Sequence, residues 1–204
     1  MHKEQIQEAG DTVNASKAVV MLHGRGGSAA DFLSLAADFN LENYALYAPQ
    51  ATNNTWYPYS FLAAPEQNEP WLSSALELVG KTVHRIIEKG IPKERIYFLG
   101  FSQGACLALE YLGRHAARYG GAAAFTGGLI GDKLYPENYQ GDFNGMPVFI
   151  GTSEPDSHVP VERVHSTARI FKTMGADVTE KMYKNMGHTI IQDEIDSVNR
   201  LLFN

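Results

Sequence analysis

Short apolar runs and longer amphipathic segments alternate along the chain from about residue 18 to its end. The apolar runs are rich in β-branched, aromatic and small side chains, as buried strands are. They are Ala18–Leu22, Tyr44–Ala48, Arg95–Leu99, Gly121–Thr126, Met146–Gly151 and Asp177–Tyr183. Segments with apolar residues every three or four positions lie between them and predict helices at 31–39, 70–90, 105–112, 161–174 and from about 191. Strands alternating with helices predict an α/β fold, with a doubly wound, mostly parallel sheet covered by helices on both faces.

The length of 204 residues predicts a single domain, 1–204, with one sheet and no cap domain. Residues 1–17 are polar and fit either an edge strand or a disordered arm. The net charge is −6, and no Lys/Arg cluster is present, so nucleic acid is not expected as a partner. We also expect a cytoplasmic protein without a membrane span, because no apolar leader or long apolar stretch occurs. Whether the chain forms a homodimer stays open.

The five residues Gly100-Phe101-Ser102-Gln103-Gly104 join a predicted strand to a predicted helix. A serine at the centre of such a sharp turn takes a positive φ, and glycines on both sides avoid a clash between the residues that flank it. The turn raises the Ser102 hydroxyl above the sheet and leaves the backbone N–H of Gln103 free at a helix start. The pattern therefore predicts a nucleophilic serine; an ordinary turn is the alternative.

A second glycine-rich stretch, His23-Gly24-Arg25-Gly26-Gly27-Ser28, follows the first buried run. It lacks the Gly-Lys-Ser/Thr ending of a P-loop and the spacing of a dinucleotide fingerprint. We interpret it as a loop that supplies a backbone N–H to an oxyanion hole, which a nucleophilic serine requires. His23 is expected to hold this turn by hydrogen bonds.

A serine hydroxyl needs a base, usually a histidine oriented by a carboxylate. Where the order along the chain is serine, acid, histidine, four histidines remain after Ser102: His115, His158, His165 and His188. Only His188 lies in a loop after the last predicted strand, at the rim where Ser102 is expected. We therefore predict His188 as the base.

Asp156 follows the penultimate predicted strand and is the predicted acid, with a helix cap as the alternative. A metal site built on Asp156 and His158 lacks further ligands, so no metal is expected. The single cysteine, Cys106, excludes an internal disulfide and a cysteine-based zinc site, and a buried apolar role is expected for it.

Two irregular segments start from the same rim. The stretch 50–69 carries Trp56, Tyr57, Tyr59 and Phe61, and we favour a substrate-pocket wall over a separate packing cluster. The connection 127–145 could add Leu129, Ile130 and Leu134 to the pocket. Without a cap domain, short acyl groups are expected.

Together these motifs resemble the phospholipase/carboxylesterase family of α/β-hydrolases, which includes acyl-protein thioesterases and small carboxylesterases. The resemblance runs from about Lys17 to the end and rests on four motifs: Leu22-His23-Gly24-x-Gly26, the Ser102 pentapeptide, Asp156-x-x-Val159-Pro160 and Gly187-His188. It implies an α/β-hydrolase fold and cofactor-free hydrolysis of a small ester or thioester, or of a lysophospholipid. Ser102, His188 and Asp156 would be the triad, and the backbone N–H groups of Gln103 and Arg25 the oxyanion hole. A non-catalytic binding protein on the same scaffold is the alternative of another class.

The resemblance also places Trp56 at the pocket, and Tyr57, His23, Leu129 and His158 are further candidates for substrate binding. Family members commonly have an apolar residue in place of Arg25 and an acidic one in place of Gly27, and His158 is unusual. We hypothesise that the Arg25 guanidinium favours an anionic or polar acyl or leaving group. The short N-terminal segment implies reduced edge strands.

Overall fold

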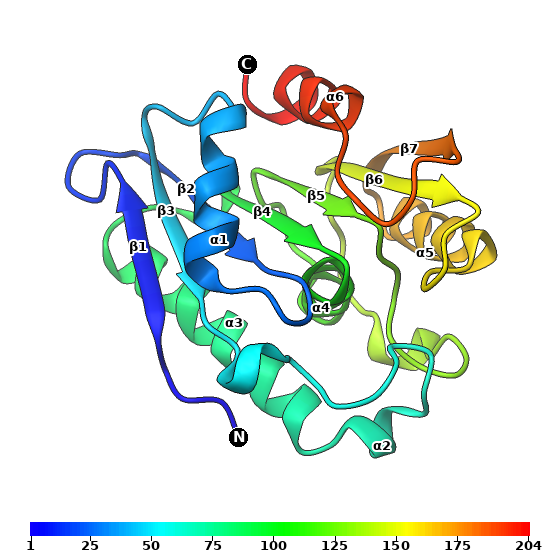
Figure 1. The fold of residues 1–204 in the computed structure, drawn as a ribbon. Coiled ribbons are helices and arrows are strands. Elements are labelled where there is room, and N and C mark those ends of the chain that lie inside the picture. The colour runs from blue at the N-terminus through cyan, green and yellow to red at the C-terminus, as the bar shows by residue number, and fades with distance from the viewer.

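A seven-stranded sheet, in the order β1-β3-β2-β4-β5-β6-β7, runs through the centre of the molecule (Figure 1). The computed structural model describes residues 1–204. The strands are β1 Ile6–Gly10, β2 Lys17–Leu22, β3 Tyr44–Pro49, β4 Ile96–Phe101, β5 Gly121–Phe125, β6 Pro147–Glu154 and β7 Asp177–Lys184. Every neighbouring pair is parallel except β1 with β3. The predicted mostly parallel sheet is therefore confirmed.

Helices cover both faces of this sheet. They are α1 Ala29–Ser34, α2 Pro65–Asn68, α3 Trp71–Glu88, α4 Gln103–Arg114, α5 Val161–Thr173 and α6 Gln192–Leu202. Successive strand residues point to opposite faces, so each buried strand contributes to two cores. Val20 of β2 belongs to the larger core, under α3, α4 and α5, whereas its neighbour Val19 belongs to the smaller one, with α1 and α6.

Of the two alternatives for the polar N-terminus, the structure has the edge strand, because Ile6–Gly10 forms the antiparallel strand β1. Two other elements differ from what the sequence pattern predicted. The predicted helix 31–39 is only α1 followed by a 3₁₀ turn, because the Ser34 hydroxyl donates to the Asp31 carbonyl oxygen, a local bond that competes with the regular helix. Strand β6 continues three residues beyond Gly151, because these polar residues pair with β7.

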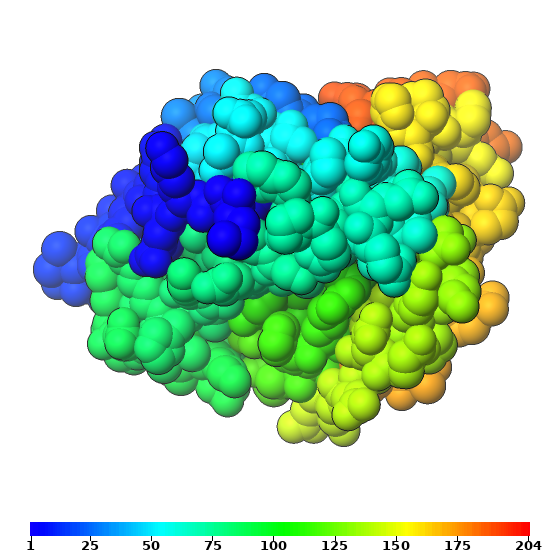
Figure 2. Space-filling model, turned by 90° about the horizontal axis from the view of Figure 1, so that it is seen from below, coloured from blue at the N-terminus to red at the C-terminus, as the bar shows by residue number.

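The first residues of the chain are attached to the outside of the segment 50–69, which we call the aromatic loop. The His2 ring donates from Nε2 to the Trp56 carbonyl oxygen (2.8 Å) and accepts the Thr52 N–H at Nδ1 (3.0 Å). In Figure 2 the dark-blue N-terminal residues lie on the surface beside the cyan and blue-green segments. The N-terminus therefore supports the aromatic loop from the surface of the molecule.

The carboxyl ends of the parallel strands meet at one rim, and the candidate residues follow those ends (Figure 1). The glycine loop 23–28 follows β2, Ser102 follows β4, Asp156 follows β6 and His188 follows β7. In open α/β sheets this rim is where ligands bind.

Candidate active site

Ser102 lies between β4 and α4 in a strained conformation, with φ 53° and ψ −117°. The flanking glycines make this turn possible. A Cβ at Gly100 would lie 2.6 Å from the Gly104 carbonyl oxygen, and one at Gly104 would overlap the carbonyl oxygen of Leu22. A larger residue at either position would push the strand and the helix apart, so the tight turn that projects the Ser102 hydroxyl depends on both glycines.

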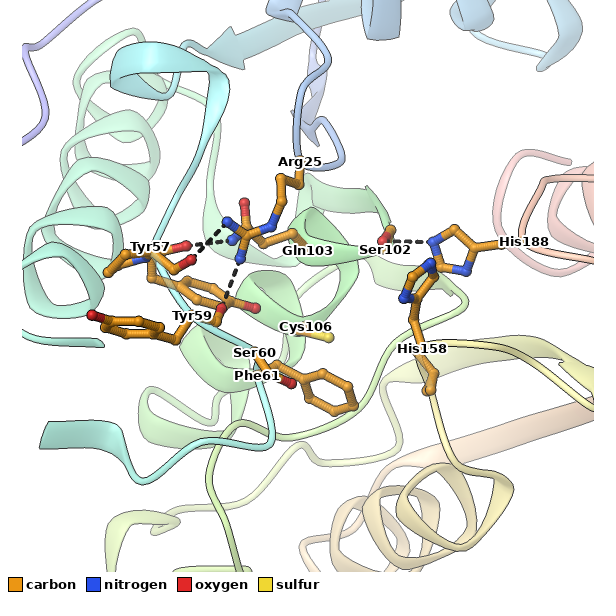
Figure 3. A pocket seen from close by; sticks show the side chains of 12 residues that line it. Arg25, Tyr57, Tyr59, Ser60, Phe61, Ser102, Gln103, Cys106, His158 and His188 are labelled. Atoms are coloured by element: carbon orange, nitrogen blue, oxygen red, sulfur yellow. Dashed lines mark hydrogen bonds between the residues drawn. The ribbon is translucent and has the colours of Figure 1, made fainter. Parts of the chain in front are cut away.

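A chain of hydrogen bonds joins Ser102, His188 and Asp156. The distance between His188 Nε2 and Ser102 Oγ is 2.8 Å, and that between His188 Nδ1 and Asp156 Oδ2 is 2.9 Å (Figure 3 shows the first). Because an ionised carboxylate only accepts hydrogen bonds, Nδ1 carries the proton and Nε2 presents its lone pair to the serine hydroxyl. This arrangement can remove a proton from Ser102.

The Asp156 carboxylate is fixed by more than the histidine. Its side chain is inaccessible to solvent, and Oδ1 accepts the backbone N–H groups of His158 and Val159, both at 2.8 Å. Burial alone would raise the pKa of Asp156, but these two hydrogen bonds and the one from His188 outweigh it and hold the pKa below its usual value. Asp156 therefore stays ionised near neutral pH. It does not cap α5, whose N-cap residue is Pro160.

Two backbone N–H groups near Ser102 have no acceptor within the protein. Gln103 is the first residue of α4, where an N–H has no intrahelical partner. In the glycine loop, Gly26 N–H donates to Asn54 O (2.7 Å) and Gly27 N–H donates to Gly24 O (3.1 Å), which leaves the Arg25 N–H unpaired. These are the donors that the sequence predicted for an oxyanion hole.

The side chain of Gln103 holds the aromatic loop. Its Oε1 accepts the Trp56 N–H at 2.9 Å, and its Nε2 donates to the Tyr57 carbonyl oxygen at 2.8 Å. Gln103 is buried, and these two hydrogen bonds pair both ends of its amide without water. The residue after the candidate nucleophile thus also positions the wall of the site.

The Arg25 guanidinium holds the next two residues of the same loop. It donates to the carbonyl oxygens of Pro58 (3.0 Å) and Tyr59 (2.7 Å), and part of this contact is visible in Figure 3. A planar fork with several N–H donors suits two neighbouring carbonyl groups. The guanidinium that the sequence suggested as a substrate ligand is therefore already bonded to the protein.

Asn68, which the sequence analysis did not single out, completes this support. Its amide is fully buried, accepts the Tyr59 N–H (2.9 Å) and donates to the Ser60 carbonyl oxygen (3.0 Å). Gly131 N–H donates to the Phe61 carbonyl oxygen at 2.7 Å. An asparagine in a loop is too common to mark such a role in sequence, so only the fold reveals it.

A cavity of about 440 Å³ opens beside Ser102, and we call it the Ser102 cavity. Its walls are formed by Arg25, Tyr57, Pro58, Tyr59, Ser60, Phe61, Ser102, Gln103, Cys106, His158, Val159 and His188 (Figure 3). Tyr57 and His158, both expected near the substrate, thus line it, and the rings of His158 and His188 pack edge to face with 4.8 Å between their centroids. Cys106 is buried as expected, but it also reaches the cavity wall.

Trp56 and Leu129, which were also expected near the substrate, do not line this cavity, and neither do Ile130 and Leu134. Trp56 is fully buried behind it and donates from Nε1 to the His23 carbonyl oxygen (2.8 Å). Leu129 is buried in the larger core, where its N–H donates to Thr167 Oγ1 (3.0 Å). Burying these apolar side chains against the core is more favourable than leaving them at an open rim.

His23 holds the turn, as predicted. Its Nδ1 donates to Gly24 O (2.7 Å) and its Nε2 accepts the Ala51 N–H (3.2 Å), while burial lowers its pKa and favours this neutral form. It lies in the wall of a second hollow, of about 500 Å³, which also includes Arg25 and His188.

The sequence profile of the phospholipase/carboxylesterase family matches residues 1–203. The chain belongs to this family. A crystal structure of a phospholipase/carboxylesterase from Dyadobacter fermentans has a TM-score of 0.98 and 56% sequence identity, covering 100% of this chain and 98% of that one.

The curated relatives of this chain are more distant in sequence. Acyl-protein thioesterase 1 of Gibberella zeae is 32% identical over 64% of this chain, and the match spans only 58% of that protein. A probable carboxylesterase of Oryza sativa subsp. japonica is 26% identical over 91% of this chain and 76% of its own length. The family member is thus an α/β-hydrolase of the esterase or thioesterase type. None of its helices has the length and apolar character needed to cross a bilayer.

Proposed function

We propose that this hydrolase cleaves small carboxylic esters through an acyl-enzyme on Ser102, with His188 as general base and Asp156 as its orienting acid. The observation that carries the proposal is the chain of hydrogen bonds from Ser102 Oγ through both nitrogens of His188 to a buried carboxylate, at 2.8 and 2.9 Å. A serine with φ 53° beside His188 and Asp156 lowers the stability of the fold, and a catalytic role explains why this strained conformation is present.

In the first half of the cycle, Ser102 Oγ attacks the acyl carbonyl carbon while His188 Nε2 takes the serine proton. The N–H groups of Gln103 and Arg25 stabilise the negative charge on the carbonyl oxygen. Collapse of the tetrahedral intermediate breaks the bond to the alcohol or thiol, which leaves with the proton from His188. Water activated by His188 then hydrolyses the acyl-enzyme and regenerates Ser102.

We assign the acyl group to the Ser102 cavity and expect short acyl chains. The cavity of about 440 Å³ lies near the small end of the range for ligand pockets, the aromatic loop forms one of its walls, and no cap domain extends it. A thioester on the same site is the second candidate, because the curated relative in Gibberella zeae is named a thioesterase, and a lysophospholipid is its variant, because the family description includes phospholipases.

Hydrolysis of p-nitrophenyl esters from acetate to palmitate tests the proposal directly. We expect activity with short esters, and a fall in kcat on the order of 10⁴ to 10⁶ in Ser102→Ala. A fluorophosphonate probe should label the wild type and not Ser102→Ala. A wild type that is inert on every ester and thioester and stays unlabelled would instead be a binding protein on this scaffold.

A further inference from the structure

The hydroxyl of Tyr57 is the unusual group in the wall of the Ser102 cavity. Tyr57 is 1% exposed, lines the cavity and is fixed through its carbonyl oxygen by Gln103. Its hydroxyl, however, makes no hydrogen bond of regular geometry in the protein, and the Cys106 thiol beside it is only a weak acceptor. Buried polar groups are nearly always paired, so an unpaired hydroxyl at a binding cavity calls for a partner that comes with a ligand.

The position of this hydroxyl relates it to the acyl group. Figure 3 shows the Tyr57 side chain directed from the aromatic loop toward Cys106, which also lines the cavity. Cys106 follows Ser102 by four residues, so it lies about one helical turn further along α4. A group bound beside Tyr57 would therefore lie a few bonds beyond the carbonyl carbon attacked by Ser102.

The electrostatics of this part of the wall favour a neutral ligand. Burial, and then the nearby Cys106, raise the pKa of Tyr57 well above its usual value, so the hydroxyl keeps its proton and can donate it. Burial also raises the pKa of Cys106 to about 12, so the thiol is uncharged. Arg25 contributes a cation to the cavity wall, but its guanidinium is already bonded to the carbonyl oxygens of Pro58 and Tyr59.

We propose that the Tyr57 hydroxyl is a specificity-determining group that donates a hydrogen bond to a neutral oxygen in the acyl chain, such as an ether, hydroxyl or keto oxygen. The enzyme would thus prefer oxygen-bearing short acyl groups to plain alkyl chains of the same length. This inference rests on the proposed ester hydrolysis, because it assigns the substrate class of that same site.

The test compares p-nitrophenyl hexanoate with the p-nitrophenyl esters of 4-methoxybutanoic and 3-ethoxypropanoic acids. All three acyl chains have the same number of heavy atoms, and in the two ethers one methylene is replaced by oxygen at different depths. For each ester, kcat/KM is measured with wild type, Tyr57→Phe and Tyr47→Phe. Tyr47 in β3 is the matched control, because its hydroxyl is also buried and unpaired but it does not line the cavity.

In wild type we expect at least one ether ester to exceed hexanoate in kcat/KM. Tyr57→Phe should lower kcat/KM for that ether more than for hexanoate, since only the ether oxygen can accept a hydrogen bond from the hydroxyl. The ether-to-hexanoate ratio should fall about tenfold, the scale of one hydrogen bond to a neutral partner. Tyr47→Phe should leave the ratio unchanged, and Tyr57→Phe should unfold at the same temperature as wild type or higher.

A ratio that Tyr57→Phe does not change, in an enzyme that hydrolyses hexanoate, overturns the inference and leaves the proposed function standing. The hydroxyl would then be satisfied by water or by the thiol. A fall in the ratio caused equally by Tyr47→Phe also overturns it. A wild type inactive on all three esters, and unlabelled by fluorophosphonate, overturns the inference and the proposed function together.

Discussion

Replacing Arg25 tests whether its guanidinium holds the aromatic loop or binds the substrate. In Arg25→Met the backbone N–H proposed for the oxyanion hole remains, but the hydrogen bonds to Pro58 and Tyr59 are lost. Arg25→Lys keeps the positive charge and loses the planar fork that reaches two carbonyl oxygens. The two variants therefore separate the effect of geometry from the effect of charge.

The structure sets the size of the expected effect. A hydrogen bond from a charged donor contributes about 1.5–3 kcal/mol when it is protected from solvent. Arg25 is exposed, so water competes for both carbonyl groups and we expect about 1–2 kcal/mol for the pair together. If that free energy keeps the loop in its catalytic position, its loss lowers kcat/KM by about tenfold.

The assay measures kcat/KM for p-nitrophenyl hexanoate and for the mono-p-nitrophenyl ester of adipic acid, which carries a carboxylate at the end of the acyl chain. Both variants should lose activity by a similar factor on both esters, with little recovery in Arg25→Lys. A loss confined to the anionic ester, with recovery in Arg25→Lys, would refute the loop-holding role and favour the hypothesis of an anionic substrate.

Three further predictions concern residues around the site. Glu194 of α6 is fully buried with one unpaired carboxylate oxygen, and burial raises its pKa to about 7. Because this folded pKa lies above the unfolded value of 4.5, the contribution of protonated Glu194 to the free energy of unfolding is fully present below pH 4.5. It is lost as pH rises through 7, which lowers the free energy of unfolding by roughly 2–4 kcal/mol. Urea unfolding from pH 4 to 9 should show this decline in wild type, and Glu194→Gln should lack it. Gly104→Ala should greatly reduce soluble, folded protein, measured by circular dichroism, because its Cβ would overlap the Leu22 carbonyl oxygen; recovery at wild-type stability would contradict the packing. Gln103→Ala should lower kcat/KM about tenfold, because two buried hydrogen bonds to the aromatic loop are lost, yet still react with fluorophosphonate; complete loss of labelling would assign the side chain a more direct role.

Local patterns were sufficient to predict the sheet and the grouping of three side chains at its rim. Ser102, Asp156 and His188 each follow a strand whose apolar run is visible in the sequence, and parallel strands bring such positions together. The side-chain contacts of the aromatic loop could not be predicted in this way. They depend on the path of an irregular segment, which no periodicity encodes.

Arg25 and Trp56 show how this limit affects functional assignments. The charge of Arg25 suggested a ligand for the substrate, but its partners lie more than 30 positions away in the chain. Trp56 was expected at the pocket and lies behind it, because its ring packs on His23 with 4.9 Å between centroids. In both cases the residue type indicated that the position matters, and only the fold showed what it contacts.

Gln103 has a consequence for how such an enzyme can change over time. Its backbone N–H is proposed to act on the reacting carbonyl group, while its side chain fixes the loop that shapes the cavity. A mutation of the Gln103 side chain that reshapes the cavity therefore also disturbs the position of the Gln103 backbone N–H. New substrate preferences should arise more readily by changes at Tyr57, Tyr59 or Phe61, whose side chains line the cavity, than by changes at Gln103. A library randomised at those three positions, with Gln103 fixed, is the shorter route to altered selectivity.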